Sequence, residues 1–525
     1  MLSGPPEGFP EPDVELINAF AQPFNNSVAA ARTCYSSKVV YPADVDKDEK
    51  ARALRDSIAE SIYEAGHHTT IQHPTFQFVL KRVSRQFLWS FLHSHPFYNS
   101  EQVSQRYVEV KRGNYVVPPM PEPARARFEA VAELQMDGYK KLQELIEPDV
   151  TKEYFRIYPG RRREPEKWKN GIKKKVIEVA RYVLPVATHA HLFHTVSGLT
   201  LHRYHRLCRQ YDTPVETRLV VDRMIAAVNR MDPLFFRRIE DEIPLEETLE
   251  HRMLETCRGP EKVGSAAAFV AEFDRDLGPW HSKLADYKAN AEATMARSVR
   301  TVLGATADRL SDADAIEAVM NPSINRYLGG SLNVLTLSKL ARAMNHPHFT
   351  FRKKLSHTAD SQDQRHRMTP GTRPILAAHF VPEKPDYIVP VVVEKSPAAR
   401  EEYDRILRET WKGIGDLLSA GVSAEYALYL LPNAFPIRFE ESGDLMHLHH
   451  KWTTRLCYLA QEEIWRACRE ETLQVAEVHP RLGRHITAPC GLRKTAGATP
   501  FCPEGNRYCG VPVWSKPVSE YARVI

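Results

Sequence analysis

The feature that most constrains this chain is a weak internal repeat, because a repeated sequence predicts a repeated fold. Residues 72–78 and 345–351 share the pattern His-Pro-x-Phe-x-Phe. Three further echoes follow the same order in both parts of the chain: an Ala-Arg pair, a Leu-Pro pair and a histidine-rich segment. The His-Pro echoes are 273 residues apart and the Leu-Pro echoes 247, so the two copies differ in length. We therefore predict a diverged tandem duplication with its junction near residues 241–265.

With 525 residues, the chain is long enough for two copies that each bury a core. Its 43% hydrophobic and 26% charged residues are typical of globular proteins. The net charge of +5 is too small to indicate a nucleic-acid polymer as partner, but it is compatible with phosphorylated small molecules. The sequence shows neither a signal peptide nor a run of 18 apolar residues, so we expect a cytoplasmic protein without a membrane partner.

The spacing of apolar residues predicts both helices and strands. Apolar residues recur three and four apart, as in amphipathic helices, in residues 48–65, 125–146 and 173–184. Residues 75–83 alternate between apolar and polar, which predicts a strand. Residues 388–393 are apolar and β-branched, but Pro390 restricts them to an edge strand or a loop.

These patterns predict an α+β fold of two similar helix-rich domains, each with a small, mainly antiparallel sheet. We expect the first copy to span residues 1–240 and the second, diverged copy to span residues 265–475. Residues 476–525 have no counterpart in the first half and are expected to form a short C-terminal extension that contains cysteines.

Basic, imidazole and hydroxyl groups gather around the predicted strand at residues 75–83. They are His67, His73, Arg85, His93, His95, Ser104, Gln105 and Arg106. Arginine forms charge-assisted bidentate hydrogen bonds and serine adds a hydroxyl donor, so such a set could hold a phosphate. Structural roles are also open at this point. The histidines could cap a helix–strand junction, Arg106 could form a surface ion pair, and Arg181 could interact with the dipole of the helix that it ends.

A second polar segment lies at residues 356–367. Twelve almost wholly polar residues are typical of a solvated loop. However, this segment follows the second His-Pro-x-Phe-x-Phe motif as residues 104–107 follow the first. The shared position makes it a candidate for a functional role as well.

Taken in order, the motifs of the first half resemble those of the flavin-dependent thymidylate synthases. That family reads Ala-Ala-Arg, Gly-His-x-(Ser/Thr)-x-x-x-His, Phe-x-Phe, Val-Ser-Arg, Arg-His-Arg, Ser-x-Arg-Tyr and Arg-x-x-Leu-Pro. All but the Arg-His-Arg signature are found here, beginning at Ala30, Gly66, Phe76, Val83, Ser104 and Arg181. The similarity covers about residues 20–225 and, more weakly, about 290–470. Each motif alone is weak, but the series in this order is specific.

The first half departs from the family at the Arg-His-Arg signature. Counted forward from the Val-Ser-Arg motif, the signature falls on residues 93–95, which read His-Ser-His. Counted back from the Ser-x-Arg-Tyr motif, its histidine falls on His95. In the second half, residues 365–367 spell Arg-His-Arg, although this triplet could instead be the echo of Arg106.

Other family positions differ between the two halves. The family tends to have a glutamine where this chain has Ser90, and an arginine where it has Cys208. The second half provides Arg455 at the place of Cys208, but it has Leu428 at the place of Arg181. We therefore predict that the halves are complementary, with one site drawing arginines from both.

The alternative is that Arg455 pairs with a nearby acid such as Glu462 or Glu463. In that case it would be structural.

The resemblance implies reductive methylation of dUMP to dTMP. In this family NADPH reduces FAD, methylenetetrahydrofolate gives the carbon, and the reduced flavin passes a hydride to the nucleotide, so no protein nucleophile is required. The resemblance assigns catalytic roles to Ser104 and Arg106, and substrate binding to Ser104, Gln105, Arg106, Arg181 and Arg455. It assigns FAD binding to His67, Arg85, His95, Arg365 and His366. Because the family forms tetramers, a homodimer of this two-copy chain is expected to mimic them.

Two other functions are compatible with the sequence. One is a flavin-dependent enzyme of the same fold that acts on another pyrimidine nucleotide. The other is a catalytically inactive nucleotide-binding scaffold. The loss of the Arg-His-Arg signature from the first half motivates the first of these.

The C-terminal extension concentrates three of the eight cysteines in the last 40 residues. Cys490, Cys502, Cys509 and His485 together would suit a tetrahedral zinc site. The spacing is irregular and contains no Cys-x-x-Cys pair, so reduced structural cysteines are the alternative.

Overall fold

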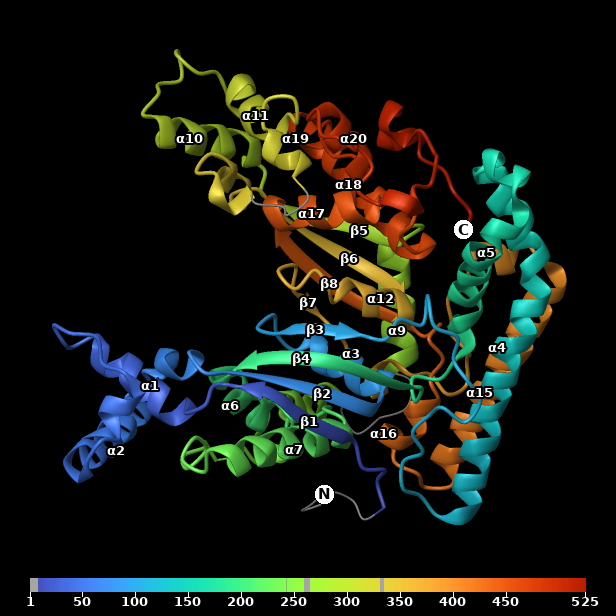
Figure 1. The fold of residues 1–525 in the computed structure, drawn as a ribbon. Coiled ribbons are helices and arrows are strands. Elements are labelled where there is room, and N and C mark those ends of the chain that lie inside the picture. The colour runs from blue at the N-terminus through green and yellow to red at the C-terminus, as the bar shows by residue number, and fades with distance from the viewer. Residues whose placement is uncertain (1–7, 242, 259–264, 331–334) are drawn as a thin grey trace.

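The fold consists of two four-stranded antiparallel sheets, one in each half of the chain (Figure 1). The computed structural model describes residues 8–241, 243–258, 265–330 and 335–525. The first sheet has the strand order β1 (Asp13–Ala19), β2 (Thr75–Ser84), β4 (His189–Ser197) and β3 (Asn99–Gln102). The second has the same order with β5 (Ser282–Tyr287), β6 (His348–Ser356), β8 (Pro436–Asp444) and β7 (Gly371–Thr372). The predicted α+β fold in two copies is confirmed.

The two sheets correspond residue by residue. Phe78 of β2 pairs with His194 of β4, and Phe351 of β6 pairs with Glu441 of β8. We call such residues matching positions. They are 273 residues apart in the first part of β2 and β6, and 247 apart from β4 and β8 onward. Arg82 lies at a bulge with φ of 56°, and this additional residue reduces the offset after β2 to 272.

Each of these central strands leads into a helix that a serine caps. Ser84 accepts a hydrogen bond at the start of α3 (Arg85–His93), and Ser356 does so at the start of α12 (His357–Asp363). Such a cap satisfies one of the free backbone N–H groups of the first turn. The two caps therefore provide a common origin for counting along the loops that follow.

Further helices cover the sheets and build two projecting arms. In the first half they are α1 (Pro23–Thr33), α2 (Glu49–Glu64), α6 (Gly198–Leu207) and α7 (Val215–Met231). In the second they are α9 (Ser265–Leu277), α10 (Ala291–Leu303), α11 (Asp312–Met320), α17 (Leu445–Arg455) and α18 (Glu462–Val478). The first arm carries α1 and α2, and the second carries α10 and α11 (Figure 1).

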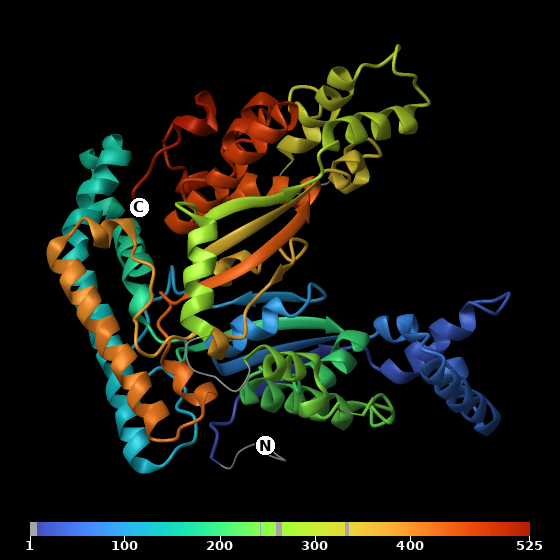
Figure 2. The ribbon, with the colours of Figure 1, turned by 180° about the vertical axis from the view of Figure 1, so that it is seen from behind.

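A pair of long helices forms a common edge of the molecule, as Figure 2 shows from behind. These helices are α4 (Glu122–Ile157) and α15 (Pro397–Ser419), and α5 (Pro165–Ala180) packs beside α4. Glycines allow the close contact in both directions. A Cβ at Gly138 would lie 2.4 Å from Ile406, and one at Gly413 would lie 2.3 Å from Val131.

The two Leu-Pro echoes meet at the junction between the halves. Pro185 and Pro432 form an isolated antiparallel bridge. The amide of Val186 donates to the carbonyl of Leu431, and the amide of Asn433 donates to the carbonyl of Leu184, both at 2.8 Å. The repeat detected in the sequence thus corresponds to a contact between the two copies.

The predicted elements agree with this fold. Residues 48–65, 125–146 and 75–83 lie in α2, α4 and β2, and residues 173–184 cover the end of α5. Residues 388–393 form no strand, in line with Pro390; they lead into the short helix α14 (Val391–Glu394). Among the residues that the structure describes, we find no helix with the length and apolarity needed to cross a membrane.

The C-terminal extension begins with α19 (Pro480–Gly483) and α20 (Pro489–Thr495) on the second half. It then runs toward α4 and α5 of the first half (Figure 1). There Ile525 is buried in the core formed by α4, α5 and α15.

Candidate functional site

Two arginines of the first half reach across the junction to the loop between α17 and α18. Arg106 donates from Nη2 to the carbonyl of Leu459 at 2.6 Å, and its Nε pairs with Glu178 of α5. Arg181, at the end of α5, donates from Nη2 to Oε1 of Gln461 at 3.1 Å. Arg106 is therefore no surface ion pair, since only 14% of its side chain is exposed. Arg181 is buried as well.

Arg455 of the second half joins these two arginines. It is the last residue of α17, it is buried, and its Nη2 donates to the carbonyl of Gln362 at 2.6 Å. Glu462 is paired with Arg466, and Glu463 accepts hydrogen bonds from the cap serine of α12. These acids are thus engaged elsewhere, and the pairing of Arg455 with either of them is not found.

Polar side chains fill the space beside the arginines. Oε1 of Gln105 accepts from Nδ2 of Asn433 at 3.1 Å, and the same Nδ2 lies 3.0 Å from the carbonyl of Arg181. Ser104 accepts a hydrogen bond from the backbone amide of Arg106 at 3.2 Å, which shapes the loop that carries the predicted substrate residues.

This cluster holds more positive charge than its carboxylates balance. Within the described ranges, no carboxylate forms an ion pair with Arg85, Arg181 or Arg455. Burial, reinforced by Arg106, lowers the pKa of Arg181 to about 10. Burial and Arg181 lower the pKa of Arg85 to about 9. Arginine keeps its proton in proteins, so these shifts express the cost of gathering cations rather than a loss of charge.

Several polar atoms of the cluster are buried without a hydrogen-bond partner. They are Nε of Arg85, Arg181 and Arg455, Nε2 of Gln105 and Oε1 of Gln362. Buried polar groups in proteins are nearly always paired, so unpaired ones call for an explanation. Four of the five are donors, four carried by a cation-rich set, which is what a bound anion would satisfy.

The structure decides which residues of the first half match the Arg-His-Arg triplet. Nine residues beyond the cap serine stands His93 in the first half and Arg365 in the second. Residues 365–367 are therefore the match of residues 93–95, and not of Arg106. The signature lost from the first half is present in the second.

This triplet lies against the first half. Nη2 of Arg365 is 2.8 Å from a carboxylate oxygen of Glu101. Arg367 donates to the carbonyl of Pro96 and to Oδ1 of Asn99, both at 3.2 Å. The loop that carries the signature of one copy thus contacts the segment around β3 of the other.

A cavity of about 390 Å³ lies between this loop and the first sheet. Gln102 and Phe193 line it from the first half, and Gln364, Arg365 and Arg367 from the second. Gln102 also accepts a hydrogen bond from Arg85 at 2.9 Å, which connects the cavity to the arginine cluster.

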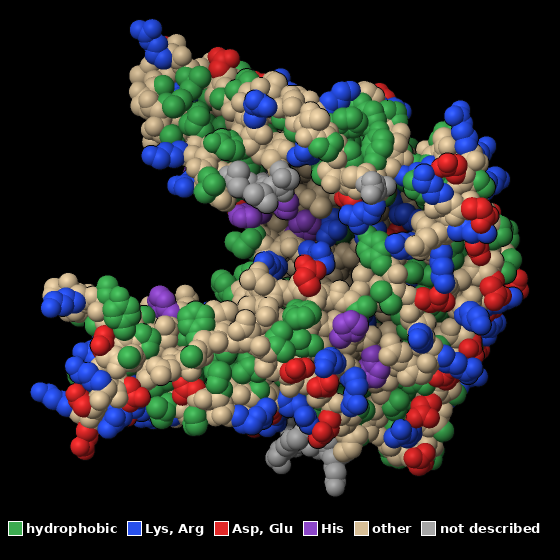
Figure 3. All heavy atoms as spheres, in the orientation of Figure 1, with side chains coloured by type: hydrophobic (Ala, Val, Ile, Leu, Met, Phe, Trp, Pro, Cys, Tyr) green, Lys and Arg blue, Asp and Glu red, His purple; other side chains and the backbone are tan. Residues whose placement is uncertain are grey.

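A smaller cavity of about 190 Å³ lies within the second half. It is lined by Arg365, His366, Arg367, Met446, His447 and other residues. Figure 3 shows a wide indentation between the two arms, with histidine and basic side chains on its inner wall.

Two residues predicted to bind the cofactor lie apart from the triplet's own cavity. His67 is exposed and precedes the short helix at residues 68–72. His95 packs against Phe97 and Tyr204, and burial lowers its pKa to about 4. Arg85, in contrast, lies at the junction, and Arg365 and His366 line the smaller cavity.

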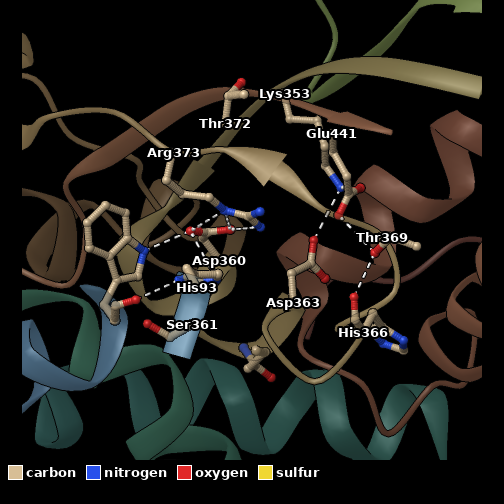
Figure 4. Close-up of polar contacts among 12 residues, drawn as sticks. His93, Lys353, Asp360, Ser361, Asp363, His366, Thr369, Thr372, Arg373 and Glu441 are labelled. Atoms are coloured by element: carbon tan, nitrogen blue, oxygen red, sulfur yellow. Dashed lines mark hydrogen bonds and ion pairs between the residues drawn. The ribbon is translucent and has the colours of Figure 1, made fainter. Parts of the chain in front are cut away.

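The opposite junction lacks the corresponding groups. The replaced positions are Leu428 for Arg181, Cys208 for Arg455 and Ser90 for Gln362. Arg373, which is present there, is already paired: its Nη2 lies 2.8 Å from Oδ1 of Asp360 (Figure 4). Trp89 of the first half donates to the other oxygen of Asp360 at 2.7 Å. An internal carboxylate thus satisfies the arginine at this junction.

The predicted zinc site is not supported. Among the described residues, no three His, Cys, Asp or Glu side chains are placed to hold a metal ion. His485 lies 2.7 Å from Glu317, and burial raises the pKa of Cys490 to about 12, which keeps its thiol protonated. Cys502 and Cys509 are free and partly buried. The cysteines of the extension are thus structural, as the alternative stated.

Sequence reasoning missed several residues of this site. They are Glu178, Gln362, Arg367, Asn433 and Gln461. Gln362 could have been found by counting six residues from each cap serine, which aligns it with Ser90. The others contact the cluster only through the packing of the two halves.

Comparison with known proteins gives the same two copies. The family described as "Thymidylate synthase complementing protein" matches residues 15–234 and again residues 283–481. A flavin-dependent thymidylate synthase of Clostridium tetani is 28% identical over 233 residues, which are 43% of this chain and 85% of that protein. One of Nitratidesulfovibrio vulgaris is 30% identical over 234 residues, which are 43% of this chain and 86% of that protein.

Proposed function

Because the chain belongs to the thymidylate synthase complementing protein family with both of its halves, we propose that it is a flavin-dependent thymidylate synthase. Its reaction is the reductive methylation of dUMP to dTMP, with methylenetetrahydrofolate as carbon donor and NADPH as reductant. The observation that carries this proposal is the buried arginine cluster at the junction, whose donors lack partners and whose charge lacks carboxylates.

The cluster suits the phosphate of dUMP. Arg106, Arg181 and Arg455 would bind it, since guanidinium groups form charge-assisted hydrogen bonds with phosphate oxygens. Burial of Arg181 and Arg455 strengthens such interactions because little water screens them. Ser104 and Gln105 would orient the nucleotide from the same loop as Arg106.

The Arg-His-Arg loop of the second half suits FAD. Arg365 and His366 line a cavity, and Nε2 of His366 is a buried ring nitrogen without a hydrogen-bond partner, which an anionic cofactor could engage. Arg85 and the histidines His67 and His95 of the first half are the other proposed contacts. When bound, the flavin supplies the hydride of the reaction, which is why no nucleophilic residue is needed.

The protein's own contribution is binding and orientation. Arg365 and Arg367 line the larger cavity from one half, and Gln102 lines it from the other. The arginine cluster lies next to that cavity through Arg85. Holding a nucleotide and a second reactant in one water-poor junction can lower the barrier by making the reaction effectively intramolecular.

We further propose one such site per chain and a homodimer as the working assembly. The site takes Arg106 and Arg181 from one half and Arg365 and Arg455 from the other. The opposite junction lacks the matching arginines. Two chains of two copies each would reproduce a four-copy assembly with closed symmetry.

The proposal is tested by two measurements on the purified full-length protein. We expect a yellow protein, or one that turns yellow with FAD, and release of tritium from [5-³H]dUMP when methylenetetrahydrofolate and NADPH are present. A protein that stays colourless with FAD would refute the enzyme and favour a scaffold. Flavin binding without tritium release would point to another pyrimidine substrate.

A further inference from the structure

Beneath the Arg-His-Arg loop lies a cluster of five charged side chains without any solvent exposure. It consists of Lys353, Lys451, Asp363, Glu441 and Glu471. Nζ of Lys353 lies 2.9 Å from Glu441, 2.9 Å from Glu471 and 3.2 Å from Asp363. Nζ of Lys451 lies 2.6 Å from Glu441 and 2.9 Å from Asp363. We call these five residues the ionic cluster.

The ionic cluster touches both ends of the loop at residues 364–368 (Figure 4). Asp363 is the last residue of α12 and directly precedes the loop, and its carbonyl accepts from the amide of His366 at 2.8 Å. Thr369 directly follows the loop. Its hydroxyl lies 2.9 Å from the carbonyl of His366 and 3.4 Å from Oε1 of Glu441.

The first half has no such cluster. The residues that match the five charges are Leu80, Tyr204, Phe91, His194 and Met224. Tyr204 packs there against Phe91, with ring centroids 4.5 Å apart, and bonds to His194 at 2.9 Å. The loop above this largely apolar core reads His-Ser-His. The charges of the core and the arginines of the loop are thus present together in one copy and absent together from the other.

Packing alone does not explain the ionic cluster. Buried ion pairs cost much desolvation energy, and apolar residues of similar volume often stabilise a core as well or better. The first half shows that this fold accepts such a core. The three carboxylates exceed the two lysines by one charge, and the cluster faces cations: Asp363 interacts with Arg455 and His366, and Glu441 with Arg373.

We propose that Lys353, Lys451, Asp363 and Glu441 are positioning residues, which fix the Arg-His-Arg loop so that Arg365 and Arg367 face the first half. The lysines hold Asp363 at the start of the loop, and Glu441 engages Thr369 at its end. The net negative charge offsets the repulsion among the cations above it. The identity of the ligand that this loop serves rests on the proposed function, but the anchoring of the loop does not.

The first test transplants the core of the first half. The variant carries Lys353→Leu, Asp363→Phe, Glu441→His, Lys451→Tyr and Glu471→Met. We expect it to fold, as judged by its circular dichroism and thermal transition. Its backbone amides at residues 364–368 should exchange hydrogen at least tenfold faster than in the wild type, and its dissociation constant for FAD should rise at least tenfold. A folded variant with unchanged exchange and unchanged FAD affinity would overturn the proposal.

A second test covers the case that the transplant does not fold. Thr369→Val removes one tether and leaves every ion pair in place, so we expect exchange in the loop and the FAD dissociation constant to rise about three- to tenfold, the equivalent of one hydrogen bond. Thr369→Ser keeps the hydroxyl and should restore both. Thr350→Val, which removes a similar hydroxyl bond to Ser442 on β6 away from the loop, is the matched control and should change neither.

Thr369→Val with wild-type exchange in the loop, or with losses that Thr369→Ser does not restore, would refute the anchoring role. If the wild type itself binds no FAD, the proposed function fails. The exchange measurement still decides whether the ionic cluster positions the loop.

Discussion

The hydroxyl of Tyr429 donates a hydrogen bond of 3.0 Å to the carboxylate of Glu216 across the junction between the halves. The matching residue Tyr182 donates to Glu463, which matches Glu216. Each glutamate also accepts hydrogen bonds from the cap serine of its own half. The corner between strand and helix in each copy is therefore held by the other copy, with approximate twofold symmetry. This symmetry makes each half a natural control for the other.

The two tyrosines should differ in their effect on the nucleotide. Tyr429→Phe and Tyr182→Phe should each lower the free energy of unfolding by about 1.5–3 kcal/mol, because each removes a hydrogen bond from a buried carboxylate. Tyr182 also accepts a hydrogen bond from Gln461, the partner of Arg181. We therefore expect only Tyr182→Phe to weaken dUMP binding, measured by calorimetry beside urea unfolding. Equal dUMP affinities in the two variants would show that Tyr182 acts on stability alone.

Only one of the two junctions should bind the nucleotide. At the other, Leu428 and Cys208 replace the arginines, and Asp360 already pairs with Arg373. Isothermal titration with dUMP should therefore give one site per chain. A value of two would mean that the opposite junction also binds, and the asymmetry would then have no functional meaning.

Much of the fold was predictable because the local patterns agree with the final structure. The alternation of residues 75–83 gives β2, the spacing in residues 48–65 gives α2, and Pro390 excludes a strand. The repeat predicted two similar copies, and the motif order predicted the family. The bulge at Arg82 could not be predicted, since it changes the register by one residue without a clear signal in the sequence.

The site was predictable in part, and the limit lies in the contacts between the copies. The convergence of Arg106, Arg181 and Arg455 follows from the complementary losses of the two halves. Glu178 and Gln461 do not follow from any motif, because only the packing of the junction brings them to the arginines. The predicted zinc site shows the opposite error: cysteines close in sequence suggested a cluster that the fold does not build.

Arg106→Ala should weaken dUMP binding about ten- to a hundredfold and FAD binding much less. A hydrogen bond to a charged group contributes roughly 1.5–3 kcal/mol, and 1.4 kcal/mol corresponds to a factor of ten. Fluorescence of FAD and calorimetry with dUMP measure the two affinities. Arg112, an exposed arginine paired with Glu133, provides the control Arg112→Ala, which should change neither. A similar loss for both ligands would mean that Arg106 is structural.

The arginines unique to one half should act on the phosphate. Arg181→Leu and Arg455→Cys each introduce the residue of the matching position, which the fold already accommodates in the other copy. We expect each to weaken dUMP binding at least tenfold and to leave the affinity for deoxyuridine, which lacks the phosphate, nearly unchanged. If Arg455→Cys binds dUMP as the wild type does, the site is not shared between the halves.

The affinity for dUMP should fall as the pH rises above 8, and Lys175 should be responsible. Its Nζ lies 3.1 Å from Glu178, but burial outweighs this carboxylate and lowers the pKa of Lys175 to about 8. A phosphate dianion bound at Arg106 favours the charged form of Lys175, so binding above pH 8 must take up a proton. The affinity should then drop by up to about tenfold per pH unit, since one pKa unit corresponds to 1.36 kcal/mol. The free protein should respond in the opposite direction through this group, because an unfolded lysine titrates near 10.4 and the unfolded chain binds the additional proton between pH 8 and 10. Calorimetry from pH 7 to 9.5 measures the slope, and deoxyuridine corrects for titration of the uracil ring. Lys175→Met should flatten the dUMP profile, and a profile that stays as steep in this variant would assign the proton to another group.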